Sequence, residues 1–257
     1  MVKIATWNVN SVKARLPILL DWLARFSPDI VMLQELKEVA ENFPRGEVEA
    51  LGYHAAVVGQ KAYNGVALLS KQPLEKIVDR LPGDDQDDQA RYVEATTFGL
   101  RVASLYLPNG NPVDSDKYPY KLRWMARLQQ QAQAALASEQ PVVFAGDYNI
   151  IPEDQDCYDP KVWEDDALFR LESRKAFRRL INLGYVDAFR ALNQDSDAYT
   201  FWDYQRGAWQ RNHGIRIDHQ LLSPQAADRL QKVGIDKALR DLPKASDHTP
   251  LWIELAD

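Results

Sequence analysis

Short apolar segments alternate along the chain with turn signals, and their periodicity predicts both strands and helices. Continuous or alternating apolar runs predict ten strands: Val2–Trp7, Ile30–Leu33, His54–Val58, Val66–Ser70, Arg91–Thr97, Leu100–Leu107, Pro141–Ala145, Tyr199–Trp202, Ile217–Leu222 and Leu251–Leu255. Apolar residues at helical spacing predict three helices: roughly Ser11–Arg25, a long segment from Leu122 to Leu136, and a segment with Phe177, Leu180 and Ile181 that ends at Gly184.

The connections between these elements predict an α/β fold. Asn64-Gly65 and Gly99 each lie between two expected strands, which is typical of β-hairpins. Other strands are separated by a helix, as in parallel units. Hairpins and helical crossovers in one chain predict mixed sheets with helices outside, and we expect two such sheets packed face to face. No repeat and no linker rich in Gly, Ser or Pro divides the chain, so we expect a single domain over residues 1–257.

Composition narrows the class of protein. The chain is 46% hydrophobic and 26% charged, which is the balance of a globular protein. Its net charge of −6 argues against a protein that coats nucleic acid by bulk charge, but not against a nucleic-acid enzyme. A single cysteine, Cys157, excludes a disulfide framework. No segment reaches the ~20 apolar residues of a membrane span, so we expect a soluble cytoplasmic protein without membrane association.

Polar residues stand where several expected strands end. They are Asn8, Asn10, Gln34, Glu35, Tyr106, Asp147, Asn149, Asp218, Asp247 and His248. Each one alone is compatible with an ordinary turn, because Asn and Asp side chains bond to nearby backbone. Glu35 is less ordinary, because a carboxylate beside a buried strand needs a partner, a metal or solvent. Together the set is rich in oxygen donors and contains no reactive Ser or Cys, which suits a hard divalent cation such as Mg²⁺.

This set also predicts a reaction. A divalent cation beside a phosphate oxygen acts as a Lewis acid, and an Asp next to a water molecule acts as a general base. Asp218 with His248 would form a carboxylate–imidazole pair that favours the cationic imidazole. An imidazolium that faces a phosphate stabilises the charge of the transition state. The residues therefore predict metal-dependent hydrolysis of a phosphodiester or phosphomonoester.

Five motifs carry a family resemblance. Thr6-Trp7-Asn8-Val9-Asn10, Leu33-Gln34-Glu35, Gly146-Asp147-Tyr148-Asn149, Arg216-Ile217-Asp218 and Ser246-Asp247-His248 occur in the order seen in the endonuclease/exonuclease/phosphatase superfamily. Within it the chain resembles the exonuclease III family of abasic-site endonucleases, from Val2 to about Leu255. The resemblance implies a four-layer α/β sandwich of two mixed sheets with helices outside, which agrees with the pattern above.

The resemblance also implies a metal site. Glu35 matches the principal Mg²⁺ ligand, and Asn8 and Asp247 match residues that help to hold the metal or its water shell. Asp147 and Asn149 are also placed on the metal in some descriptions of the family. Mn²⁺ is expected to substitute for Mg²⁺. Asn10 stands where some members have Asp.

The same resemblance implies catalytic roles. Asp147 matches the residue that deprotonates the attacking water. Asn149 matches a neighbouring residue that orients or stabilises the reacting groups. Asp218 matches the carboxylate paired with the histidine, here His248. Tyr106 matches a tyrosine beside the scissile phosphate.

Duplex DNA with abasic sites, nicks or 3′ ends is the partner that the resemblance implies for a monomeric enzyme. The matching DNA-contact positions are Lys61 and Tyr63 in a backbone-gripping loop, Arg91 on a phosphate, and Phe201, Ile215 and Ile217 in an apolar pocket for a flipped-out abasic sugar. We also expect Lys121 or Arg123 to contribute to the basic rim. Some members have Trp where this chain has Ile215, so processing of 3′ ends is expected to rival or exceed abasic-site incision.

Three alternatives remain open at this stage. A 3′-end-processing enzyme with little abasic-site incision would carry the same motifs. Another phosphoesterase of the superfamily, such as a nuclease of the DNase I type, an inositol polyphosphate phosphatase or a sphingomyelinase, would share Asn8, Glu35 and Asp247-His248. Nucleases of the DNase I type and sphingomyelinases, however, have a second histidine where this chain has Tyr106. A non-catalytic nucleic-acid-binding protein of the same fold would be expected to have lost one or more of four residues, all of which are present here: Glu35, Asp147, Asp218 and His248.

Overall fold

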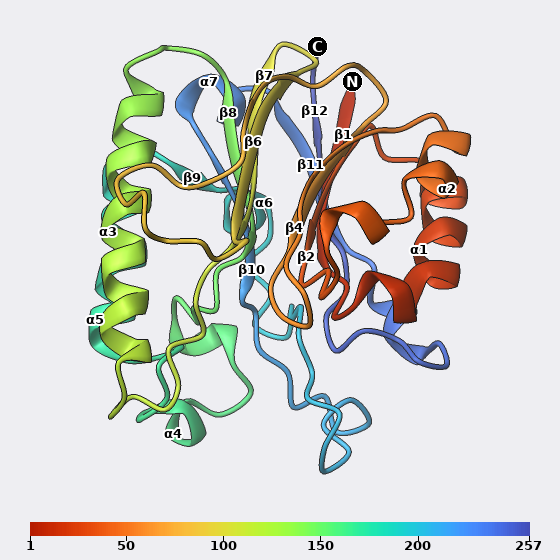
Figure 1. Cartoon of the computed structure of the whole chain (residues 1–257). Coiled ribbons are helices and arrows are strands. Elements are labelled where there is room, and N and C mark those ends of the chain that lie inside the picture. The colour runs from red at the N-terminus through yellow and green to blue at the C-terminus, as the bar shows by residue number, and fades with distance from the viewer.

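Two six-stranded β-sheets pack face to face in the computed structural model, which describes residues 1–257 (Figure 1). The first sheet has the strand order β11 (Leu230–Ile235), β12 (Leu251–Leu255), β1 (Val2–Asn8), β2 (Ile30–Gln34), β4 (Val66–Ser70) and β3 (His54–Val58). The second has the order β5 (Glu75–Val78), β6 (Tyr92–Thr97), β7 (Leu100–Tyr106), β8 (Val142–Asp147), β10 (Asp218–Leu222) and β9 (Val186–Asp187). Each sheet is mixed, because β1–β2 and β7–β8 are parallel and the other pairs are antiparallel.

Helices cover the outer face of each sheet and complete four layers. In Figure 1, α1 (Val12–Phe26) and α2 (Arg45–Ala50) lie beside the first sheet, and α3 (Lys117–Leu136) and α5 (Leu171–Asn182) lie beside the second. Shorter helices are α4 (Pro160–Trp163), α6 (Ala188–Leu192), α7 (Pro224–Ala227) and the 3-10 turns Ala40–Asn42, Asp154–Asp156 and Lys237–Asp241. The predicted four-layer α/β sandwich is confirmed. None of the helices is both long and apolar enough to span a membrane.

Side-chain alternation sorts the apolar residues into three layers. Successive side chains of a strand point to opposite faces, so Ile4 of β1 lies between the sheets while Ala5 and Trp7 pack toward α1. In β8, Val143 and Ala145 lie between the sheets, and Val142 and Phe144 pack toward α3 and α5. The predicted hairpins are confirmed as the antiparallel pairs β3–β4 and β6–β7.

The inter-sheet layer becomes polar at the lower end in Figure 1, where β1, β2, β7 and β8 all end. Asn8 and Tyr106 are the last residues of β1 and β7, and they continue the inward-facing series that begins with Val2 and Leu100. Asp147 continues the series of β8, and Asp218 that of β10. On β1, β7, β8 and β10, the side chains that face the other sheet therefore change from apolar to polar at this end. Together these polar side chains form a cluster between the sheets.

The predicted strand over Tyr199–Trp202 is wrong except at one residue. Only Phe201 makes bridges, to Ile215 and to His248. The hydroxyl of Thr200 accepts hydrogen bonds from the backbone N–H groups of Ile217 and Asp218, both at 3.2 Å. The N–H groups of Ile217 and Asp218 are therefore bonded to a side chain and not to a neighbouring strand. The pairing of Phe201 with Ile215 thus remains an isolated bridge.

The sequence pattern missed three edge strands, β5, β9 and β11. Their side chains are mostly exposed or half-buried, because each strand lies at the edge of its sheet. Such strands lack the apolar runs or clean alternation that identify a strand in a sequence.

Candidate active site

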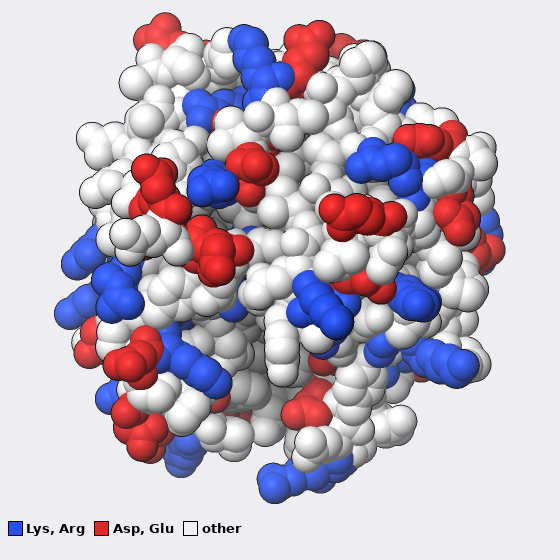
Figure 2. Space-filling view, viewed as in Figure 1, with Lys and Arg blue, Asp and Glu red and all other residues white.

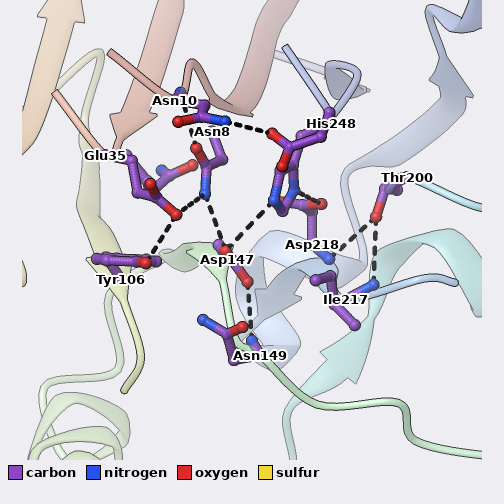
Figure 3. Close-up of polar contacts among 12 residues, drawn as sticks. Asn8, Asn10, Glu35, Tyr106, Asp147, Asn149, Thr200, Ile217, Asp218 and His248 are labelled. Carbon is purple, nitrogen blue, oxygen red and sulfur yellow. Dashed lines mark hydrogen bonds and ion pairs between the residues drawn. The ribbon is translucent and has the colours of Figure 1, made fainter. Parts of the chain in front are cut away.

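Asn8 joins the two sheets at the polar end of the inter-sheet layer (Figure 3). Its amide nitrogen donates to Glu35 Oε1 at 3.1 Å and to Asp147 Oδ2 at 3.0 Å. Asn8 is fully buried, and its own Oδ1 accepts from the backbone N–H of Asn10 at 2.9 Å. The side chain therefore fixes the separation of two carboxylates that come from different sheets.

Glu35 follows β2 directly and is held by three donors. Tyr106 donates its hydroxyl to Oε1 at 2.7 Å, and the Lys37 ammonium lies 2.9 Å from Oε2. Burial alone would raise the pKa of Glu35, but the hydrogen bond and charge of Lys37, with help from Tyr106 and Asn8, lower this pKa below its ordinary value. Burial and the two nearby carboxylates of Glu35 and Asp147 raise the pKa of Tyr106 far above its ordinary value, so the phenol remains a proton donor.

His248 lies between two carboxylates of the second sheet. Its Nδ1 is 2.8 Å from Asp218 Oδ2, and its Nε2 is 3.7 Å from Asp147 Oδ2. Burial opposes the imidazolium, but Asp218, Asp147 and Asp247 outweigh burial and raise the pKa of His248 to about 10. Burial and the charge of Asp218 raise the pKa of Asp147, while His248 opposes this effect. The ring is therefore cationic at neutral pH.

Asn149 follows Asp147 by two residues and turns back into the site. Its backbone N–H donates to Asp147 Oδ1 at 2.8 Å, and its amide donates to the Leu107 carbonyl at 2.8 Å. Asn109 donates its amide to Asn149 Oδ1 at 3.2 Å. Asn149 has φ of 47° and Glu35 has φ of 52°, in the left-handed region that most residues avoid. Such strain persists where the surrounding structure holds it, and it clusters at active sites.

Asp247 and Asn10 lie at the margin of this cluster. Asn10 donates its amide to Asp247 Oδ1 at 3.0 Å and accepts a hydrogen bond from Lys37 at its own Oδ1. Asp247 is half-buried, whereas Asp147, Asp218 and His248 are buried. Asn10 thus links the carboxylate of Asp247 to the lysine that pairs with Glu35.

The donor set fits a hard divalent cation. Glu35 is ionised, and its carboxylate already faces the cationic group of Lys37. Asp147 and Asp218 add two buried carboxylates on either side of the cationic ring of His248. The buried Oδ1 of Asp218 has no hydrogen-bond partner. Carboxylate and amide oxygens predominate, as Mg²⁺ and Mn²⁺ prefer, and no thiolate is present at the site.

The expected DNA-contact residues lie at the same end of the molecule. Figure 2 shows a hollow at this end that is bordered by side chains of both signs, including Lys and Arg. Lys61 and Tyr63 are exposed in the loop that follows β3, and Tyr63 is 70% exposed. The guanidinium of Arg91 lies over the ring of Tyr106, 4.9 Å from its centroid, and donates to the Tyr106 carbonyl at 3.2 Å. Arg91 therefore contacts Tyr106, which in turn bonds Glu35, whereas Lys61 and Tyr63 are exposed in a separate loop.

The three residues expected to form an apolar pocket differ in exposure. Phe201 is half-buried, and its ring lies 5.0 Å from the ring of His248 in an edge-on arrangement. Ile215 and Ile217 are only 1% and 2% exposed, within an apolar cluster that includes Leu168 and Phe169. Phe201 also lines a groove of about 320 Å³, whose other lining residues include Tyr158, Trp163, Arg206 and His213. The structure thus places all three residues together, but only Phe201 reaches this groove.

The expectation that Lys121 belongs to an exposed basic rim is wrong. Lys121 is fully buried because its stem packs beneath the loop after β7, and its ammonium donates to two backbone carbonyls. Arg123, the alternative, is exposed.

The sequence pattern also missed contacts made by Lys37, Asn109 and Thr200. Lys37 lies two residues after Glu35, and Asn109 lies three residues after Tyr106. This closeness in sequence was the only indication that they belong to the site. Thr200 offered no signal, because its role depends on the backbone of a segment 17 residues away.

Known proteins of similar sequence and structure match this chain over nearly its whole length. A model described as "Endonuclease/Exonuclease/phosphatase family" matches residues 5–248. The exodeoxyribonuclease III of Haemophilus influenzae is 37% identical over 265 residues, which cover 98% of this chain and 99% of that protein. A solved 3′ phosphatase from Neisseria, bound to a product DNA hairpin, is 38% identical with a TM-score of 0.98 and covers 100% of both chains. An AP endonuclease from Archaeoglobus fulgidus is 36% identical with a TM-score of 0.95 and covers 99% of both chains.

Proposed function

Since the chain belongs to the endonuclease/exonuclease/phosphatase family, we propose that it is a Mg²⁺-dependent enzyme that hydrolyses phosphodiesters 5′ to abasic sites and processes the 3′ ends of duplex DNA. The chain is a hydrolytic nuclease of DNA repair, in agreement with its full-length relatives. The cluster is complete within one chain, which supports a monomeric enzyme.

The observation that carries the proposal is the buried imidazolium of His248 between Asp218 and Asp147, with Glu35 joined to Asp147 through Asn8. A buried cation and two carboxylates at one end of the inter-sheet gap suit a phosphate group and a water molecule. Charge that develops on phosphate oxygens is stabilised most strongly by groups that are already in place and shielded from water.

Each residue has a role that follows from its contacts. Asp147 accepts a proton from the attacking water as the new P–O bond forms. The bond between phosphorus and the 3′ oxygen breaks, and this oxygen keeps the bonding pair and takes a proton from solvent to become the 3′-hydroxyl. A base whose pKa is raised toward neutrality is well suited to this transfer. His248 offers Nε2–H to the phosphate, because its other ring nitrogen is committed to Asp218. The hydroxyl of Tyr106 donates to Glu35, and the backbone N–H of Asn149 donates to Asp147, so each residue borders one of the two carboxylates.

The proposed metal would be held mainly by Glu35, with Asn8, Asp147, Asn149 and Asp247 as further oxygen donors. A bound Mg²⁺ supplies charge neutralisation at a phosphate oxygen. We propose that Mn²⁺ substitutes, because it accepts the same oxygen ligands.

The apolar cluster supports an abasic substrate. A deoxyribose without its base can be flipped out at low cost, and apolar walls suit it better than they suit the polar edge of a base. We propose that Phe201, Ile215 and Ile217 form this wall, while Lys61, Tyr63 and Arg91 contact the DNA backbone.

A second candidate is a 3′-end-processing enzyme with little abasic-site incision. The burial of Ile215 and Ile217 favours it, because only Phe201 of the three wall residues remains accessible to a sugar. A terminal phosphate would need the catalytic cluster but not an open pocket for an internal nucleotide.

Single-turnover hydrolysis of three duplexes tests these candidates: one with an internal abasic analogue, one with a 3′-phosphate at a nick, and one with a plain recessed 3′ end. The proposed function predicts cleavage 5′ to the analogue that leaves a 3′-hydroxyl. Rapid removal of the 3′-phosphate with no cleavage at the analogue would favour the second candidate instead. Asp147→Asn is the control and is expected to abolish all three activities if one site performs them.

A further inference from the structure

Lys121 is a buried lysine on α3 with no assigned role. Burial lowers the pKa of its amine from 10.5 to about 7. Its side chain is 0% exposed, and its Nζ donates to the carbonyl oxygen of Asn109 at 3.0 Å and to that of Asn149 at 2.5 Å. Removing an ammonium group from water is unfavourable unless other groups replace its hydration. Here two backbone carbonyls replace it, so this position carries a cost that an apolar residue would avoid.

The two carbonyls belong to the loops that bear the catalytic groups. Asn109 lies in the loop that follows Tyr106, and Asn149 lies in the loop that follows Asp147. The two side-chain amides also meet, because Asn109 donates to Asn149 Oδ1 at 3.2 Å. Lys121 thus links the backbones of the two loops, and the side chains of Asn109 and Asn149 link the same loops a second time.

Asn149 needs such support. Its backbone has φ of 47°, in the left-handed region where an L-residue is held only by its surroundings. Its N–H is the donor to Asp147 Oδ1 at 2.8 Å, so a change in this backbone would also move the carboxylate. The contact with Lys121 and the contact with Asp147 therefore lie on opposite sides of one strained residue.

The loop closes tightly over the stem of the lysine. A Cβ at Gly110 would lie 2.7 Å from Lys121 Cδ and 3.1 Å from Ala167 Cβ. Gly110 also has φ of 92°, which side chains rarely adopt. The stem is thus enclosed on a fixed path, and its ammonium has little freedom to leave the two carbonyls.

We propose that Lys121 is a positioning residue for phosphodiester hydrolysis, holding the backbones of Asn109 and Asn149 so that the Asn149 amide and the Asp147 carboxylate keep their places. The inference rests on the proposed function of the Asp147–His248 cluster. It assigns no contact between Lys121 and DNA, because Lys121 is buried.

Lys121→Met tests the proposal, since it removes the charge and the donors while keeping a stem of similar length. We expect the single-turnover rate at saturating enzyme to fall by about 100-fold, the loss typical of a misplacement of about 1 Å. The dissociation constant for uncut duplex should change by no more than about twofold, because no DNA contact is removed. An unchanged rate in folded enzyme would overturn the proposal, as would a loss confined to DNA affinity.

A double-mutant cycle with Asn149→Ala separates positioning from general support of the fold. If Lys121 acts mainly through Asn149, Lys121→Met should cost much less in the Asn149→Ala background than in the wild type, because residues that act as a unit are non-additive. Losses that multiply fully would contradict the proposal.

Two further variants cover a failure to fold. Leu128→Ala removes a fully buried side chain from the same helix and is the control for destabilisation, with an unchanged rate expected below its melting temperature. If Lys121→Met does not fold, Lys121→Gln retains one donor and should show a smaller loss. An unchanged rate in Lys121→Gln would then overturn the proposal. Wild-type hydrolysis of the three duplexes is measured in parallel, so a failure of the proposed function would be visible as inactive wild-type enzyme.

Discussion

Asp218 holds the ring of His248 from behind, with Oδ2 lying 2.8 Å from Nδ1. Both residues are buried, and the hydrogen bond leaves Nε2 of His248 directed toward Asp147. The carboxylate fixes which ring nitrogen faces Asp147 and favours the cationic form of the ring.

Removing either member of this pair should cost a similar factor. We expect Asp218→Asn and His248→Gln each to lower the single-turnover rate by about 10²–10³, as for the loss of one preorganised charged or hydrogen-bonding group. The double variant should be little slower than the slower of the two single variants, because the two residues act as a unit. The measurement is the rate on one duplex at saturating enzyme, and additive free-energy losses would argue against a functional pair.

Glu35 should control the requirement for metal. Glu35→Ala removes an ionised carboxylate, so it should raise the Mg²⁺ concentration needed for half-maximal activity as well as lower the rate. The rate is measured across a Mg²⁺ titration of enzyme first stripped with a chelator. Glu38→Ala, outside the cluster, is the matched control and should leave the titration unchanged. Full activity of stripped wild-type enzyme without added metal would refute the metal dependence.

Arg91 should report the electrostatic part of DNA binding. Each phosphate contact contributes about −0.9 to the slope of log affinity against log salt concentration, so Arg91→Ala should flatten this slope by roughly one unit. The rate at saturating substrate should remain nearly intact. Lys232→Ala, on edge strand β11 beside Glu254, is the control and should leave the slope unchanged. A large loss of rate with an unchanged slope would instead make Arg91 a catalytic residue, acting through the ring of Tyr106 that it covers.

His219 should make the stability of the fold depend on pH. Burial, together with the charge of Arg216, lowers the pKa of His219 from 6.5 to about 4. The unfolded chain therefore binds a proton that the folded chain does not, and the free energy of unfolding falls as pH decreases from about 6.5 to about 4. The lost stability is about 3 kcal/mol at most, by the rule of 1.36 kcal/mol per pKa unit.

Urea unfolding between pH 4.5 and 7.5 measures this effect. His219→Gln, which lacks a titrating ring, should flatten the dependence on pH. His54→Gln on the exposed surface of β3 is the control and should retain it. An identical pH dependence in wild type and His219→Gln would show that His219 does not cause the acid sensitivity.

Local pattern was sufficient for most of the central strands and for the polar residues that form the candidate site. The strands β1, β2, β7, β8 and β10 are buried and apolar, so their periodicity is strong, and the polar residues that end them stand out. The motif order then identified the family without any knowledge of contacts. Edge strands β5, β9 and β11 were not predicted, because half-exposed side chains carry little periodic signal.

The sequence alone determined that Asn8, Tyr106, Asp147 and Asp218 fall in phase with apolar residues of their strands, since side-chain alternation is a local property of the backbone. Only the packing of the two sheets decided that these four side chains face the same gap, and that Asn8 reaches both Glu35 and Asp147. The burial of Lys121 likewise depends on the tertiary structure. A lysine is usually exposed, and only the closure of the loop around Gly110 placed this one beneath the catalytic loops. Burial depends on what other segments cover, and no periodicity within one segment encodes it.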